Sequence, residues 1–184
     1  MAYHPYKKKK KDKIYRLADE YSNFYLRFIE NTAYEGAGTF MQLSDKQAYK
    51  IWCGYAYESV CMKHIKQIKR ALGVGGVYTT THSYLKQATA EEQGIQVDLL
   101  IERADRVINL FEIKFYNTEF VFTKSYGEQL QKRLWAFQRL SKTKKHVWLT
   151  MITTFGIRHN QHSLGLVEFV LTLDDLFLED IDYF

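Results

Sequence analysis

Two absences narrow the class of protein that this sequence encodes. None of its apolar runs approaches the roughly 20 residues needed to span a bilayer, and its early lysine run is followed by no apolar segment typical of a secretory signal. It has only two cysteines, Cys53 and Cys61, eight residues apart in one predicted helix. At about 1.5 Å per residue they lie roughly 12 Å apart, too far for a disulfide. We therefore expect no membrane association and a reducing, cytoplasmic setting.

Several catalytic signatures are also missing. The glycine-rich segment 73–76 follows a predicted helix rather than a strand and lacks the Lys-Ser/Thr ending of a Walker A motif, so this chain alone is not expected to hydrolyse ATP. There is no Gly-x-Ser-x-Gly elbow, and neither cysteine has an evident base nearby. His159 and His162 lie three residues apart, but no carboxylate or cysteine pattern completes a zinc site.

The net charge of +5 is unevenly distributed along the chain. Residues 1–11 carry five lysines (Lys7 to Lys11) and no acid, whereas the last eleven residues carry five acids and no base. Residues 12–173 are therefore mildly basic, which permits nucleic-acid binding without establishing it. The lysine run is interpreted equally well as a solvated tail or as a phosphate-binding segment.

The length of 184 residues and the 46% hydrophobic content fit one domain with a sizeable core. We divide the chain into a flexible basic tail (1–13), a helical lead-in (14–43) and a main domain (44–184). The domain begins with a capping box, Ser44 to Gln47. Apolar periodicity predicts a helix over 44–72, strands over 77–85, 95–101 and 107–115, a helix over 124–142, strands over 146–153 and 166–171, and a short helix over 172–177. Residues 119–123 extend the sheet or form a connection, and 154–163 are predicted as a loop. The fold class is α/β.

The most informative stretch is 94–115, where two apolar runs of strand length are joined by the polar segment 102–106. Asp98 interrupts the first run, and Glu112 and Lys114 interrupt the second. A buried carboxylate costs several kcal/mol unless a cation or hydrogen bonds compensate it. Glu112 and Lys114 are two apart and share one face of their strand, and in a hairpin Asp98 comes alongside. Two interpretations of these three residues are open. They form either the site that a divalent-metal phosphodiesterase requires or an incidental buried salt bridge.

In that site Asp98 and Glu112 would offer oxygen ligands to Mg²⁺ or Mn²⁺, and the carbonyl of Ile113 could add a third. The metal would polarise a phosphoryl oxygen and acidify a bound water. Lys114 would orient that water or stabilise the developing negative charge. Glu58 falls in the apolar stripe of the 44–72 helix. It is either a partly exposed residue at the stripe edge or an acid that holds the metal through water or binds a second ion.

Together these pieces resemble the PD-(D/E)xK nuclease superfamily, whose members have a restriction-endonuclease-like core. The matching motifs, in αβββαβ order, are Gly54-x-x-x-Glu58, Gln96-Val97-Asp98 and Glu112-Ile113-Lys114. The chain is more closely similar to the C-terminal domain of a family of prokaryotic AAA-type ATPases that carry such a module. The resemblance extends over nearly the whole of residues 14–178, and the phrases that carry it are YRLADEYSNFYLRFIEN, GYAYESVCMKHI, GIQVDLLIERADRVINLFEIKF, KSYGEQLQKRLWAF and LTMITTFG.

The resemblance implies a mixed central sheet flanked by helices, acting as a Mg²⁺-dependent endonuclease on DNA. Asp98, Glu112 and Lys114 take the metal and catalytic places, and Glu58 that of the helix acid. Val97 replaces the proline before the aspartate, and the ATPase half is absent. We therefore expect an AAA-type ATPase partner in cis or in trans, and a homodimer is compatible with duplex cleavage. The competing interpretation is a catalytically silent nuclease fold kept for DNA binding or ATPase assembly.

Overall fold

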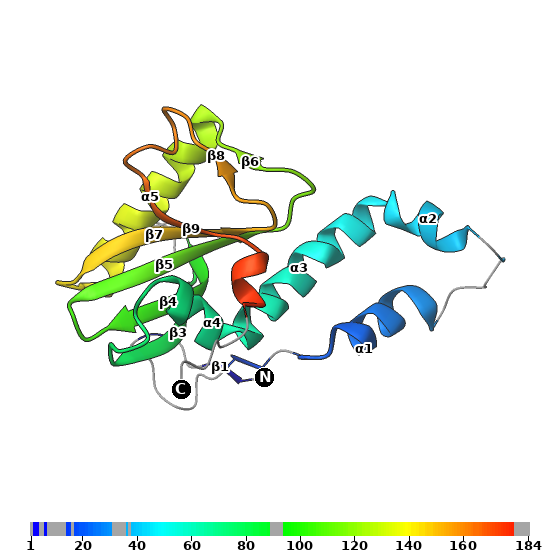
Figure 1. The fold of residues 1–184 in the computed structure, drawn as a ribbon, viewed down its shortest axis with the longest axis horizontal. Coiled ribbons are helices and arrows are strands. Elements are labelled where there is room, and N and C mark those ends of the chain that lie inside the picture. The colour runs from blue at the N-terminus through cyan, green and yellow to red at the C-terminus, as the bar shows by residue number, and fades with distance from the viewer. Residues whose placement is uncertain are drawn as a thin grey trace.

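A mixed sheet of five strands, in the order β3-β4-β5-β7-β9, forms the centre of the molecule (Figure 1). The computed structural model describes residues 2–3, 6, 14–15, 17–30, 36, 38–88 and 94–178. The strands are β3 (Thr79–Lys86), β4 (Ile95–Arg103), β5 (Val107–Lys114), β7 (His146–Thr153) and β9 (Val167–Leu171). The first three pair antiparallel, and β7 and β9 continue the sheet in parallel. The predicted α/β class with a mixed sheet is confirmed.

Helices cover both faces of this sheet (Figure 1). The helix α5 (Lys124–Ser141) packs on one face, and α3 (Gln47–Lys63), α4 (Ile65–Ala71) and the 3₁₀ turn η3 (Asp174–Leu176) pack on the other. Alternate side chains of a strand point to opposite faces. Accordingly Ile108 and Leu110 of β5 join the apolar cluster of α5, whereas Phe111 joins that of α3 and α4. The chain order is α3-α4-β3-β4-β5-β6-α5-β7, which contains the elements of the predicted αβββαβ order with α4 and the short strand β6 (Phe120–Val121) added.

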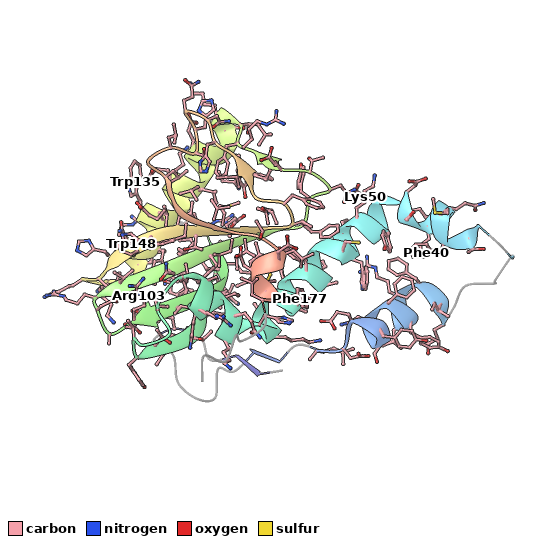
Figure 2. The ribbon with its side chains drawn as sticks, in the orientation of Figure 1. Phe40, Lys50, Arg103, Trp135, Trp148 and Phe177 are labelled. Carbon is pink, nitrogen blue, oxygen red and sulfur yellow. The ribbon has the colours of Figure 1, made fainter. Side chains whose placement is uncertain are left out.

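The N-terminal helices lie beside the part of α3 that extends away from the sheet (Figure 1). They are α1 (Glu20–Phe24), the π-helix η2 (Tyr25–Ile29) and α2 (Thr39–Ser44). Aromatic rings join them to α3, with the Phe24 and Phe28 centroids 5.2 Å and 6.1 Å from that of Trp52. Figure 2 shows Phe40 on α2, and its side chain is exposed.

The predicted basic tail falls mostly outside the described residues, as do Lys7–Lys11 and residues 179–184. Within it, β1 (Ala2–Tyr3) pairs antiparallel with β2 (Ile14–Tyr15), a short strand at the start of the lead-in that was predicted to be helical. Tyr6 is buried, and its ring centroid lies 5.9 Å from that of Phe137 on α5. The division into tail, lead-in and main domain stays a prediction.

The prediction of one continuous helix over residues 44–72 was wrong. Ser44 is not an N-cap but the last residue of α2, and its hydroxyl donates to the Met41 carbonyl at 2.8 Å. The long helix α3 ends at Lys63, and α4 resumes at Ile65. The break has a local cause, because the His64 ring Nδ1 lies 2.8 Å from the Val60 carbonyl oxygen, while the His64 backbone N–H bonds to Cys61 instead. A side chain thus takes the carbonyl that the regular helix would use.

From residue 77 onward, the elements lie within two residues of their predicted bounds, with two exceptions. The predicted 154–163 loop contains the short strand β8 (Ile157–Arg158), which pairs in parallel with β6 (Phe120–Val121) as a small separate sheet. The predicted helix over 172–177 is only the 3₁₀ turn η3. Across the described residues, no helix is both long and apolar enough to cross a bilayer.

Candidate acidic site between β4 and β5

The hairpin of β4 and β5 separates where its two carboxylates lie. Its pairing runs from Glu102–Ile108 through Ile101–Asn109 to Leu100–Leu110. The same register continued by two residues would set Asp98 opposite Glu112. Both strands are described throughout, and the ladder stops before that pair. The sheet therefore opens beside Asp98 and Glu112.

A β-bulge in β4 displaces Asp98 from the regular alternation. On the neighbouring β3, His82 pairs with Leu100 and Tyr84 with Val97. One residue of β3 thus faces both Asp98 and its successor, and Val97 and Leu100 both point into the α5 cluster although they are three apart. Bulges bend a strand and re-aim its side chains. Asp98 is half-buried, and its Oδ1 accepts a hydrogen bond from the amide of the exposed Gln96 at 2.9 Å.

Glu112 is the buried acid of the site, with 7% of the residue exposed. Its Oε1 accepts from the Tyr126 hydroxyl at 2.8 Å and lies 3.1 Å from the Lys114 ammonium, whereas its Oε2 accepts from the Arg133 guanidinium. Two cations and a hydroxyl therefore compensate its charge, as burial requires. Tyr126 and Arg133 both come from α5.

Burial raises the pKa of the Tyr126 hydroxyl, and the negative charge of Glu112 raises it further. The phenol therefore keeps its proton and acts as a donor to the carboxylate. Its ring also lies beneath the Lys114 ammonium, 5.9 Å from the ring centroid. Lys114 is the most accessible of these groups, with 40% of its side chain exposed.

These residues line one pocket of about 200 Å³. The lining consists of Glu58 from α3, Gln96, Val97 and Asp98 from β4, Phe111, Glu112, Ile113 and Lys114 from β5, and Arg133 from α5. The two helices cover opposite faces of the sheet, so the pocket forms where the parting of the strands lets both reach the same space. The structure thus brings together every residue that the sequence singled out as a site candidate.

Glu58 is half-buried, and it lies one helical turn before Cys61. Burial raises the pKa of the Cys61 thiol to about 12, with the charge of Glu58 as the second cause. The thiol is therefore neutral at physiological pH and is neither a nucleophile nor a ready metal ligand. The charged groups that line the pocket are carboxylates, one ammonium and one guanidinium.

The donors in the pocket fit a hard divalent cation, because carboxylate and carbonyl oxygens are the ligands that Mg²⁺ prefers. Within the described part of the chain, no group of three His, Cys, Asp or Glu side chains is arranged to hold a metal. Mg²⁺ does not need such a group, since it keeps several waters and takes one or two carboxylates. Asp98, Glu112 and the Ile113 carbonyl would be the ligands, with Glu58 acting through water.

The sequence patterns did not single out Tyr126 or Arg133, the two α5 residues that contact Glu112. Tyr126 packs against the apolar cluster of α5. Arg133 lies seven residues after Tyr126 and three after Leu130, within the apolar stripe of that helix. A charge on the buried face of a helix, the signal that singled out Glu58, would also have found Arg133.

Comparisons with known proteins add little. No protein-family model matches the chain, and no curated protein matches it. A crystal structure of a protein of unknown function, AF1548, is similar with a TM-score of 0.43 and 16% identity, over 64% of this chain and 64% of that one. This chain thus spans less than two thirds of that protein, and a likeness so distant carries no weight for fold or function.

Proposed function

We propose that this chain is a Mg²⁺-dependent endonuclease of the PD-(D/E)xK type, with a restriction-endonuclease-like core, which hydrolyses phosphodiester bonds in DNA. The observation that carries the proposal is the pocket at the parting of β4 and β5. Its lining includes Glu58, Asp98 and Glu112, together with the partly exposed Lys114, whose ammonium lies 3.1 Å from the Glu112 carboxylate. Three acids and a positioned amine at a gap in an apolar sheet suit metal-assisted hydrolysis of a phosphate ester.

Each residue has a distinct role in this reaction. Asp98, Glu112 and the Ile113 carbonyl would hold the cation, which would supply Lewis-acid activation of the phosphoryl group and of a water. Glu112 and the Tyr126 ring fix the Lys114 ammonium at the pocket, where it orients the attacking water or binds the phosphoryl oxygen that gains charge. Glu58 would contact the cation through a water on the α3 side of the pocket.

A second candidate is a catalytically silent module for DNA binding or for assembly with an AAA-type ATPase. One specific observation favours it, because Arg133, Lys114 and Tyr126 already satisfy the Glu112 carboxylate without a metal. In either role we propose that an AAA-type ATPase, in cis or in trans, controls the chain. A homodimer would supply two sites for duplex cleavage.

The test is incubation of the purified chain with supercoiled plasmid in Mg²⁺, Mn²⁺ or EDTA. We expect the wild type to nick the plasmid only when metal is present. Lys114→Ala should lose this activity. Lys144→Ala, which alters an exposed lysine outside the pocket, should retain it. Nicking by Lys114→Ala at the wild-type rate would contradict the assignment. If the wild type shows no nicking and no metal binding by calorimetry, the silent module is favoured.

A further inference from the structure

The two oxygens of the Glu112 carboxylate are held in different ways. Oε1 is shared by the Tyr126 hydroxyl and the Lys114 ammonium, so it keeps one donor if the other leaves. Oε2 accepts from Arg133. Whether Oε2 is open to a ligand in the pocket therefore depends on where the Arg133 guanidinium lies.

Arg133 is placed so that it can leave without disturbing the fold. Its side chain is 27% exposed, whereas that of Glu112 is 8% exposed. It sits on the buried stripe of α5 but lines the pocket, so rotation about its side-chain bonds moves the guanidinium toward solvent while the helix stays in place. The carboxylate, fixed on β5 in the middle of the sheet, has no comparable freedom.

The charges in the pocket give the exchange a direction. The proposed metal-binding carboxylates, Asp98 and Glu112, share the lining with two cations, Lys114 and Arg133. With Arg133 inside, these four groups sum to zero, and with Arg133 outside they sum to one negative charge. A divalent cation is thus better balanced once the guanidinium has left, and like charges close together in a partly buried site repel strongly.

We propose that Arg133 is a displaceable counterion of Glu112. It holds Oε2 until a divalent cation takes that carboxylate, and the released guanidinium then binds a phosphate of the nucleic acid at the pocket mouth. The guanidinium is suited to both partners, because its planar fork matches carboxylate and phosphate alike. Metal binding and phosphate binding should therefore strengthen each other, and by linkage the effect is reciprocal. The inference rests on the proposed metal site.

The first test is calorimetric titration of Mn²⁺, without nucleic acid, into the wild type, Arg133→Gln and Lys132→Gln. Lys132→Gln is the matched control, because the substitution removes the same charge from the adjacent, exposed position of α5. We expect Arg133→Gln to bind Mn²⁺ about tenfold more tightly, the order expected for one lost charge repulsion near a protein surface. Lys132→Gln should stay within about twofold of the wild type, and Arg133→Lys, which keeps the charge, should restore an affinity near the wild-type value. Unchanged or weaker binding by a folded Arg133→Gln overturns the proposal.

The second test measures the coupling to phosphate. In the Lys114→Ala background, expected not to cleave, Mn²⁺ should raise the affinity for a labelled DNA duplex, and adding Arg133→Gln should reduce that gain at least twofold. An equal gain in both variants rules out transfer of Arg133 to phosphate. If neither the wild type nor Arg133→Gln binds Mn²⁺, the proposed metal site fails and the counterion role fails with it. Metal-dependent nicking by the wild type with unchanged Mn²⁺ affinity in Arg133→Gln overturns the counterion role alone.

Discussion

The β4–β5 hairpin buries a charged side chain at each end, and the surroundings of these two side chains differ. At the turn, Arg103 is 9% exposed, and its Nε donates to Asp105 at 3.0 Å. Its guanidinium lies 5.4 Å from the Trp148 ring centroid, and Figure 2 shows both residues at the end of the sheet remote from α3. At the open end, Glu112 is 7% exposed and faces two cations.

The surroundings of these two charges differ in balance and in space. At the turn the ladder is continuous, and Asn109 links the Arg103 guanidinium to Thr150 through bonds of 3.5 Å and 3.2 Å. At the open end the ladder has stopped, and further acids share a pocket of about 200 Å³ with Glu112. A buried ion pair alone therefore does not distinguish the two ends. The open end differs in having a pocket that several charged side chains line.

The largest expected difference between the two ends is in activity. Asp98→Asn and Asp105→Asn make the same chemical change at opposite ends of the hairpin. The first removes a proposed metal ligand, so plasmid nicking in Mg²⁺ should fall by about 100-fold or more, the order found for single electrostatic groups in active sites. The second removes only a partner of Arg103 and should leave the rate within about twofold. Equal losses in both variants would mean that the two ends are not functionally distinct.

Stability should show the reverse ranking. Arg103→Ala leaves the buried Asn109 oxygen without this donor and a void beside Trp148, and we expect it to lower the free energy of unfolding by about 2–3 kcal/mol. Lys114→Ala leaves Glu112 bonded to Arg133 and Tyr126, so its cost should stay below about 1 kcal/mol. Urea denaturation in EDTA measures both. A larger loss for Lys114→Ala would make Lys114 a structural residue.

Asp98→Asn should raise the melting temperature in EDTA by about 1–2 °C. The substitution removes one of three acids that share the pocket, and the asparagine oxygen can still accept from Gln96. Relief of about 0.5 kcal/mol of repulsion corresponds to a shift of that size in a chain of this length. Asp105→Asn serves as the control and should lower the melting temperature. A lower value for Asp98→Asn as well would mean that Asp98 is paired structurally.

The sequence revealed the open end of the hairpin better than it revealed the rest of the site. Strands buried on both faces have nearly continuous apolar sequences, so Asp98, Glu112 and Lys114 were conspicuous as interruptions. The bulge at Asp98 was not predictable, because it arises from pairing with β3 rather than from the residues of β4. The contact of Arg133 with Glu112 likewise depends on how α5 docks on the sheet, a long-range outcome that no local pattern encodes.

Helix boundaries show the same limit. The Ser44–Gln47 pattern is a sound local signature of a helix start, yet Ser44 lies within the last turn of α2, a helix that the pattern does not report. The interruption at His64 depends on a ring–carbonyl bond. By contrast α5 begins at Lys124 as predicted, since the Thr123 hydroxyl accepts from the Tyr126 N–H at 3.3 Å and fixes that boundary locally.

The smallest expected effect concerns acid stability at the turn end. The hydrogen bond from Arg103 holds the pKa of the Asp105 carboxyl below its ordinary value. A folded-state pKa below the unfolded one stabilises the fold above the unfolded pKa, and this contribution is lost as the pH falls through the folded pKa. Asp105→Asn should therefore be less stable than the wild type at pH 5, and the difference should shrink steadily below about pH 4. Urea midpoints from pH 5 to pH 2.5 measure it. A difference that stays constant over this range would mean that Arg103 does not favour the ionised carboxylate, and the turn would then owe its order to the packing of Arg103 on Trp148.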